Sequence, residues 1–186
     1  MNQRFLLLPL LLLLICISCD NNRHIRYYRV QKVTIKPTIN SQPSAPFSIH
    51  WDTPIHWITT KGSSMRIGSF DIPFSDGIGD LSIIKLSGTA GGLAPNINRW
   101  RGQLSLNSHT EIEIQDYIQN GKSPFGQFQW VTIINPENKE TAFLASIFKT
   151  KTHTIFVKLS ASTDGIAQLE SQFLDFCKSF TLDTRQ

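Results

Sequence analysis

The sequence predicts a mixed α+β domain in which an antiparallel sheet is combined with helices. Late in the chain, strand-like runs follow one another with only short turns between them, which is the pattern of an antiparallel meander. A segment from about Asp164 to Phe180 then repeats apolar residues at helical spacing and predicts a closing amphipathic helix. A shorter helix is predicted near the middle of the chain. The strand-like runs are Phe128–Ile134, Thr141–Lys149 and Thr152–Leu159.

Three shorter strands are predicted before the central helix. Phe47–Trp51 (FSIHW) is the first, and we place the start of the folded domain there. Met65–Ile72 alternates between two faces, as a strand does, and Leu81–Leu86 (LSIIKL) is rich in branched residues. Pro73–Asp80, which contains Gly, Asp and Pro, predicts a turn region between these two strands.

The central stretch Ser87–Leu106 predicts a glycine-rich turn followed by a helix with two distinct faces. Glycines permit the turn, and Pro95 suits the first turn of a helix because its missing N–H is no loss there. Apolar residues then recur at helical spacing and predict a face that packs on the sheet. Gly102 is expected to stop the helix or to allow a close backbone approach. The apolar stripe consists of Leu93, Ile97, Trp100 and Leu104.

An adjoining face of the same predicted helix carries the candidate ligand-binding residues Asn96, Arg99 and Gln103. Guanidinium and amide groups hold carboxylates or phosphates, and the free N–H groups at the glycine-rich helix start would assist. The alternative is structural, with Arg99 and Arg101 bonding backbone carbonyls to fix neighbouring loops. The glycines match neither G-x-x-x-x-G-K-[ST] nor G-x-G-x-x-G, so no phosphate loop is predicted.

Local signals predict the remaining turns and helix ends. Leu106–Asp116 is ambiguous, but Ser108 or Thr110 suits the cap of a short helix from Glu111. Asn120-Gly121 predicts a tight turn. In the closing helix, the expected cap is Thr163 or Asp164.

Composition and charge fit a single globular domain with a basic N-terminal segment. The chain has 186 residues, 40% of them hydrophobic, which is enough for one domain with a real core. The net charge of +4 is unevenly distributed, because the segment from Asn21 to Trp51 contains several basic residues and no Asp or Glu. This distribution argues against a nucleic-acid binder with a basic face. The basic residues are Arg23, Arg26, Arg29, Lys32 and Lys36.

The N-terminus predicts an exported lipoprotein. Phe5–Ile17 (FLLLPLLLLLICI) is too short for a membrane span and right for a signal-peptide core. It ends in Cys16-Ile17-Ser18-Cys19, which resembles the bacterial lipobox, although Cys16 stands where Leu is usual. The resemblance implies cleavage before Cys19 and acylation of its sulfur, which would anchor the chain stably. The alternatives are an ordinary cleaved signal and an uncleaved anchor.

These features divide the chain into a signal peptide (1–18), a lipidated basic tether with a Pro-rich linker (19–46) and a single α/β domain (47–186). The basic tether would lie against anionic headgroups, each basic residue contributing about 1 kcal/mol near the surface; the alternative is a solvated tether. Ile25–Ile35 predicts a first strand or an ordered arm. With Cys19 acylated, Cys177 has no disulfide partner and is predicted to be a buried thiol.

No motif in the sequence supports catalysis or metal binding. The histidines form neither H-E-x-x-H nor a Cys/His zinc pattern, and G-x-S-x-G is absent. We therefore expect no catalytic residue, no metal site and no cofactor. The alternative, an enzyme of unknown class, predicts a strongly perturbed titratable group in a cleft.

Three local patterns resemble known groups of proteins. Two of them resemble parts of PsbP-like (DcrB-like) domains: the aromatic-rich Phe47–Trp57, in which Pro54 precedes Trp57 by three positions, and Phe173–Phe180 (FLDFCKSF). Asn96–Gln103 (NINRWRGQ) resembles a group of uncharacterised bacterial lipoproteins with an NxNRWRGQ signature. The resemblance covers about residues 47–182 and implies an α/β/α sandwich with a central antiparallel sheet. It also implies an accessory or assembly role at membranes without catalysis, and it assigns no functional residue.

We therefore expect a monomeric, lipid-anchored, non-catalytic accessory or binding protein of the bacterial cell envelope. It would face the periplasm or the cell exterior, with an envelope protein and not a nucleic acid as its partner. A protein-partner role predicts an exposed apolar patch or a groove beside the central helix. A small-anion role predicts that Asn96, Arg99 and Gln103 converge on a concave, solvent-reachable space. Burial of Arg99 against backbone carbonyls would favour the former.

Overall fold

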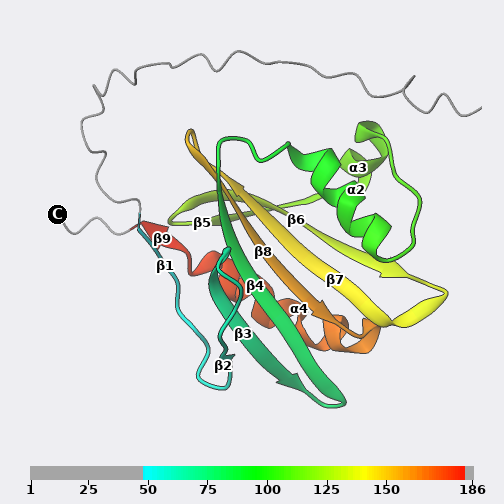
Figure 1. Cartoon of the computed structure of the whole chain (residues 1–186), viewed down its shortest axis with the longest axis horizontal. Coiled ribbons are helices and arrows are strands. Elements are labelled where there is room, and N and C mark those ends of the chain that lie inside the picture. Colours follow the sequence, from blue (N-terminus) through cyan, green and yellow to red (C-terminus); the bar gives the residue numbers. More distant parts are fainter. Residues whose placement is uncertain (1–47, 183–186) are drawn as a thin grey trace, which may run out of the picture. The chain divides into compact units, whose positions relative to one another are not determined.

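The computed structural model describes residues 48–182. In this part of the chain, seven strands form one antiparallel sheet in the order β2-β3-β4-β8-β7-β6-β5, and β1 pairs with β9 in a separate two-stranded sheet (Figure 1). The expected signal peptide (1–18), the acylated Cys19, the tether (19–46) and the strand predicted at Ile25–Ile35 lie outside the described residues.

The helices cover both faces of the large sheet. α4 lies on one face, and α2 and α3 lie on the other (Figure 1), so the predicted α/β/α sandwich with a central antiparallel sheet is confirmed. None of the helices described is long and apolar enough to cross a membrane. The bounds are β1 Ile49–His50, β2 Ile58–Thr59, β3 Arg66–Phe74, β4 Gly77–Ser87, α2 Leu93–Gln103, α3 Glu111–Tyr117, β5 Gln119–Ser123, β6 Gly126–Asn135, β7 Asn138–Lys149, β8 His153–Ala161, α4 Thr163–Lys178 and β9 Thr181–Leu182.

The predicted meander is confirmed as β6, β7 and β8, and it separates two hydrophobic cores. β7 is buried on both faces, so it reads as an almost continuous apolar run. Leu144 and Phe148 contribute to the core under α4, whereas Phe143 and Ile147 contribute to the core under α2. Alternation along one central strand therefore supplies both layers.

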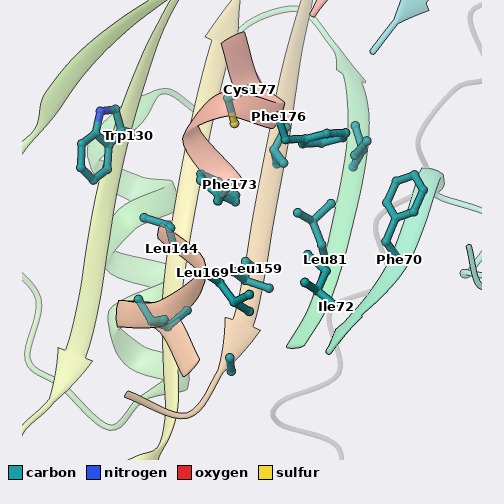
Figure 2. Close-up of a cluster of buried hydrophobic side chains, with 14 of the residues drawn as sticks. Phe70, Ile72, Leu81, Trp130, Leu144, Leu159, Leu169, Phe173, Phe176 and Cys177 are labelled. Carbon is teal, nitrogen blue, oxygen red and sulfur yellow. The ribbon is translucent and has the colours of Figure 1, made fainter. Parts of the chain in front are cut away.

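The closing helix α4 packs its apolar stripe on the sheet, as predicted. Figure 2 shows Phe173, Phe176 and Cys177 directed from α4 toward the strands, and all three are buried. Trp57 lies 4.7 Å from Phe176 between ring centroids and belongs to the same core. The cap is Ser162, whose hydroxyl accepts the N–H of Gly165 at 3.0 Å; the expected caps, one and two residues later, are wrong.

Two predicted turns differ from the structure: the first is shorter than expected, and the second is wrong. Most of 73–80 belongs to β3 and β4, because Pro73 pairs with Ile78 and only Ser75 and Asp76 form the turn. Proline is tolerated there because β2 pairs with β3 only at residues 70 and 71. Asn120 and Gly121 lie inside β5. Gly121 is needed for a different reason, since a Cβ there would lie 2.2 Å from the buried Phe128 ring.

The first strands of the described chain depart from simple alternation. Of the predicted strand Phe47–Trp51, the described residues 48–51 form a strand only at 49–50, and this strand pairs with β9 outside the large sheet. In β3 the register shifts between Arg66 and Gly68. Arg66 can therefore donate to the Ser69 hydroxyl at 2.9 Å, while Phe70 and Ile72 point into the core under α4. The irregularity brings a guanidinium onto the face of the sheet that carries α2.

Candidate functional site

Helix α2 begins with a turn that its own side chain holds in place. The turn has positive φ angles of 48° at Ala90, 83° at Gly91 and 85° at Gly92. Glycine adopts such angles without steric cost. No side chain caps the helix from outside. Instead, the Asn96 amide donates to the carbonyl oxygens of Ala90, at 2.8 Å, and of Gly92. Asn96 therefore closes the turn from within the helix.

Both polar atoms of the Asn96 side chain are occupied. Its amide oxygen accepts a hydrogen bond from Nη2 of Arg99 at 2.6 Å, and the side chain is only 2% exposed. Asn96 therefore positions the Arg99 guanidinium through this bond and presents no free polar group to a ligand. Of the three candidate residues, it is the one that the structure places in the protein interior.

The end of α2 forms a Schellman motif with a serine in the left-handed position. The Leu106 N–H donates to the Arg101 carbonyl at 2.9 Å, and the Ser105 N–H donates to the Gly102 carbonyl at 3.1 Å. Ser105 has a φ of 58°. Gly102, expected to stop the helix or to allow a close approach, does neither: it lies within the last turn, and no atom lies within 4 Å of a Cβ built there.

The loop after α2 is fixed by two helix side chains. Arg101 donates from Nε to the Asn107 carbonyl and from Nη2 to Nε2 of His109, both at 2.7 Å. The Asn98 amide exchanges two bonds of 2.8 Å with the His109 backbone. The structural alternative thus holds for Arg101, which pins a loop. It does not describe Arg99, whose guanidinium bonds the Asn96 side chain and not a backbone carbonyl.

The loop leads into α3, whose start follows a predicted signal. Thr110 accepts the Glu113 N–H, and the Glu113 carboxylate accepts the Thr110 N–H in return, forming a capping box. The predicted short helix from Glu111 is therefore confirmed, with Thr110 rather than Ser108 as its cap. Both ends of the segment that carries Arg99 are thus fixed by local contacts.

Arg99 and Gln103 line a common cavity of about 280 Å³, which we call the α2 cavity. It lies between α2 and the strands β4 and β8, with Met65 on its outer side. Both candidate side chains are exposed at its rim. The lining consists of Met65, Ser82, Ile84, Leu86, Arg99, Trp100, Gln103, Phe156 and Lys158.

Lys158 is the residue of this cavity that the sequence reasoning missed. It lies in β8 opposite Ser82, is half-buried, and donates from Nζ to Oε1 of Gln103 at 3.0 Å. Its Nζ also lies 3.9 Å from the centroid of the Phe143 ring. An amide oxygen and an aromatic face both favour the charged ammonium. The available signal was a lysine between Val157 and Leu159 in a run predicted as strand.

The surroundings of the α2 cavity carry excess positive charge. Burial lowers the pKa of Lys158, the Asp80 carboxylate opposes this effect, and Arg66 and Arg99 reinforce it. Asp80 is already engaged by Arg66 through two bonds of 2.7 and 2.9 Å. Within residues 48–182, neither Lys158 nor Arg99 forms an ion pair. Two cations therefore face one cavity without a bound carboxylate from the described chain.

A larger cavity, of about 480 Å³, lies at the other end of α2 and is separate from the α2 cavity. Gly91 to Pro95 line it together with residues of α3 and with Gln129 and Lys149. The two cavities share no lining residue. The glycine-rich helix start therefore lines a different cavity from Arg99, which lies within the helix and is linked to that start through the Asn96 side chain.

The other candidate chemistry is structural. The Cys177 thiol is free and fully buried, in contact with the Ser146 hydroxyl at 3.2 Å. Burial raises its pKa to about 12, and the contact with Ser146 opposes the shift. The predicted buried thiol is therefore confirmed. Among the residues described, no group of three or more His, Cys, Asp or Glu side chains is arranged to hold a metal ion.

Comparison with known proteins finds similarity only to solved structures. No protein family and no curated protein matches the sequence. The solution structure of PsbP (CyanoP) from the cyanobacterium Synechocystis is similar at 16% identity and a TM-score of 0.45, covering 73% of this chain and 92% of that one. LpqN of Mycobacterium tuberculosis, described as involved in cell envelope biogenesis, is similar at 13% identity and a TM-score of 0.42, covering 74% and 85%. The relation of the NINRWRGQ segment to a lipoprotein group stays a prediction.

Proposed function

We propose that this chain is an exported, lipid-anchored protein of the cell envelope that binds a small anion in the α2 cavity and acts without catalysis. The observation that carries the proposal is the pair of cations, Lys158 and Arg99, that line one cavity with no carboxylate partner among the described residues. A carboxylate or a phosphate would supply the missing charge.

The energetics of burial favour this proposal. A half-buried ammonium loses hydration that its contacts with Gln103 and Phe143 replace only in part. An anion between Lys158 and Arg99 would restore that loss through charge-assisted hydrogen bonds. Arg99 suits the role because its planar guanidinium offers several donors, and Asn96 engages only Nη2.

The mode of action follows from the groups in the cavity. Lys158 donates to Gln103 and lies over the Phe143 ring, and burial lowers its pKa. The other polar groups are a guanidinium, an amide and the Ser82 hydroxyl, which itself contacts the Lys158 carbonyl at 3.4 Å. This set binds and orients an anion, and it supports binding rather than bond cleavage.

The N-terminal sequence supports the anchored location. The apolar run that ends at Ser18-Cys19 has the features of a lipoprotein signal, and the following tether carries the basic residues. We propose that acylated Cys19 and this tether hold the domain (47–186) at a membrane as a monomer. The membrane is then the partner of the tether, and the anion is the ligand of the domain.

A second function, binding of an envelope protein, is favoured by exposed apolar side chains near the edge of the sheet. Ile55, Ile58, Met65 and Ile67 are all exposed although they are large and hydrophobic. Ile58 belongs to the two-residue edge strand β2, where another chain could pair. We place this function second because these residues carry no feature that selects a partner.

Titration of the mature chain with acetate and with inorganic phosphate tests the proposal. With Cys19→Ser to prevent acylation, chemical shifts of backbone amides in α2 and β8 are expected to change on addition of either anion. Lys158→Met and Arg99→Gln should each weaken binding at least tenfold, whereas Lys139→Met, which removes an exposed charge at the start of β7, should leave it unchanged. Shifts confined to the cavity lined by Gly91 to Pro95, or equal binding by all variants, would refute the proposal.

A further inference from the structure

We infer that the anion bound in the α2 cavity carries a short aliphatic chain. The inference rests on the proposed function and extends it to the class of ligand: a carboxylate or phosphate whose charged group meets Lys158 and Arg99 and whose apolar part lies along β4. The evidence is the uneven distribution of polar and apolar groups within the cavity.

One end of the cavity is polar and the other is apolar. Along β4, Ser82 stands opposite Lys158, Ile84 opposite Phe156, and Leu86 opposite Thr154. Side chains on one face of a strand follow at about 6.6–6.8 Å. The charged end at Lys158 therefore passes into an aliphatic surface formed by Ile84 and Leu86, one and two such steps away.

The aliphatic surface is incompletely covered by the protein itself. Trp100 and Phe156 pack edge to face at 5.9 Å and are each 4% exposed. Ile84 and Leu86 belong to the same core yet are only partly buried. Met65, which also lines the cavity, is 61% exposed. The core under α2 thus ends in an apolar trough that begins next to Lys158, in the cavity that Arg99 also lines.

The size of the cavity limits the length of the chain. A water molecule occupies about 30 Å³, so 280 Å³ admits about nine non-hydrogen atoms. A carboxylate takes three of these, which leaves room for roughly six methylene-sized groups. A long acyl chain does not fit, whereas a four- to six-carbon chain fills the trough.

A series of straight-chain carboxylates tests the inference on the mature Cys19→Ser chain. From acetate through butanoate to hexanoate, affinity should rise about three- to fourfold per methylene, the increment for burial of one CH₂, and then level off at octanoate. Ile84→Thr keeps a branched side chain in the strand but should flatten the rise without changing acetate or phosphate binding. Ile134→Thr, at an exposed position of β6, is the matched control and should keep the full rise.

The outcomes separate the inference from the function on which it rests. Binding of acetate and hexanoate with equal affinity would overturn the inference and leave the anion site intact. Failure of every carboxylate and of phosphate to bind would overturn both. Where hexanoate binds, vesicles of phosphatidylcholine containing phosphatidic acid supply the second check. Retention of hexanoate in their presence supports a free short-chain acid, whereas its displacement would overturn the inference, because the acyl chains of that lipid are longer than the cavity admits.

Discussion

Replacement of Trp100 by alanine should destabilise the domain by about 3–5 kcal/mol. Trp100 is 4% exposed and packs edge to face on Phe156. A buried aromatic side chain removes about 150–250 Å² from water, which at about 25 cal/mol per Å² corresponds to roughly 4–6 kcal/mol as an upper value. The edge-to-face contact adds about 0.5–1.5 kcal/mol. The expected loss lies below this sum because Trp100 borders the α2 cavity, so water can enter the space left behind.

Urea unfolding followed by circular dichroism measures this loss, and Arg99→Gln provides the matched comparison on the neighbouring position. Arg99 is exposed and bonds only the Asn96 side chain, so this variant should stay within about 0.5 kcal/mol of the parent. A loss below about 1 kcal/mol for Trp100→Ala would mean that α2 is not docked as described. A loss of about 1–3 kcal/mol for Arg99→Gln would instead make Arg99 a structural residue and remove the main support for the anion site.

Two further predictions concern the sheet and the anchor. Gly121→Ala should destabilise by about 1–3 kcal/mol, because its Cβ would meet the Phe128 ring at 2.2 Å while that ring is held against Phe148 at 4.8 Å. Gly102→Ala, which meets no atom within 4 Å, should stabilise the domain by about 0.5–1 kcal/mol in the same urea melts. A less stable Gly102→Ala than Gly121→Ala would contradict the structure. Cys19→Ala should abolish labelling of the protein by fatty-acid precursors in cells and leave an unprocessed or unanchored form, and continued labelling would exclude acylation at Cys19.

The elements that sequence patterns predicted well are those whose signals are local or periodic. The stripe of α2 and that of α4 repeat at helical spacing, and both helices lie on the sheet through those residues. The capping residue Thr110 was recognisable because its partner Glu113 is three positions away. Such signals need no knowledge of the rest of the fold.

The errors share a different cause, which is contact between distant segments. Gly121 suggested a turn, but its role depends on Phe128, the residue opposite it in the next strand. Lys158 was overlooked because its importance depends on Gln103, 55 positions earlier in the chain. Asn96 has the spacing of a ligand-binding residue, but the backbone bends so that its amide faces Ala90 and Gly92. Residue type and spacing alone do not distinguish these cases.

The way α2 is fastened has a consequence for how this protein can diverge. Asn96 closes the turn before the helix, and Asn98 and Arg101 fix the loop after it. None of the three lines the α2 cavity. Positions 99 and 103 are therefore free to change without loosening the helix that presents them. Under the proposed function, substitutions at these rim positions would change which ligand is bound, while the residues that hold the helix in place stay the same.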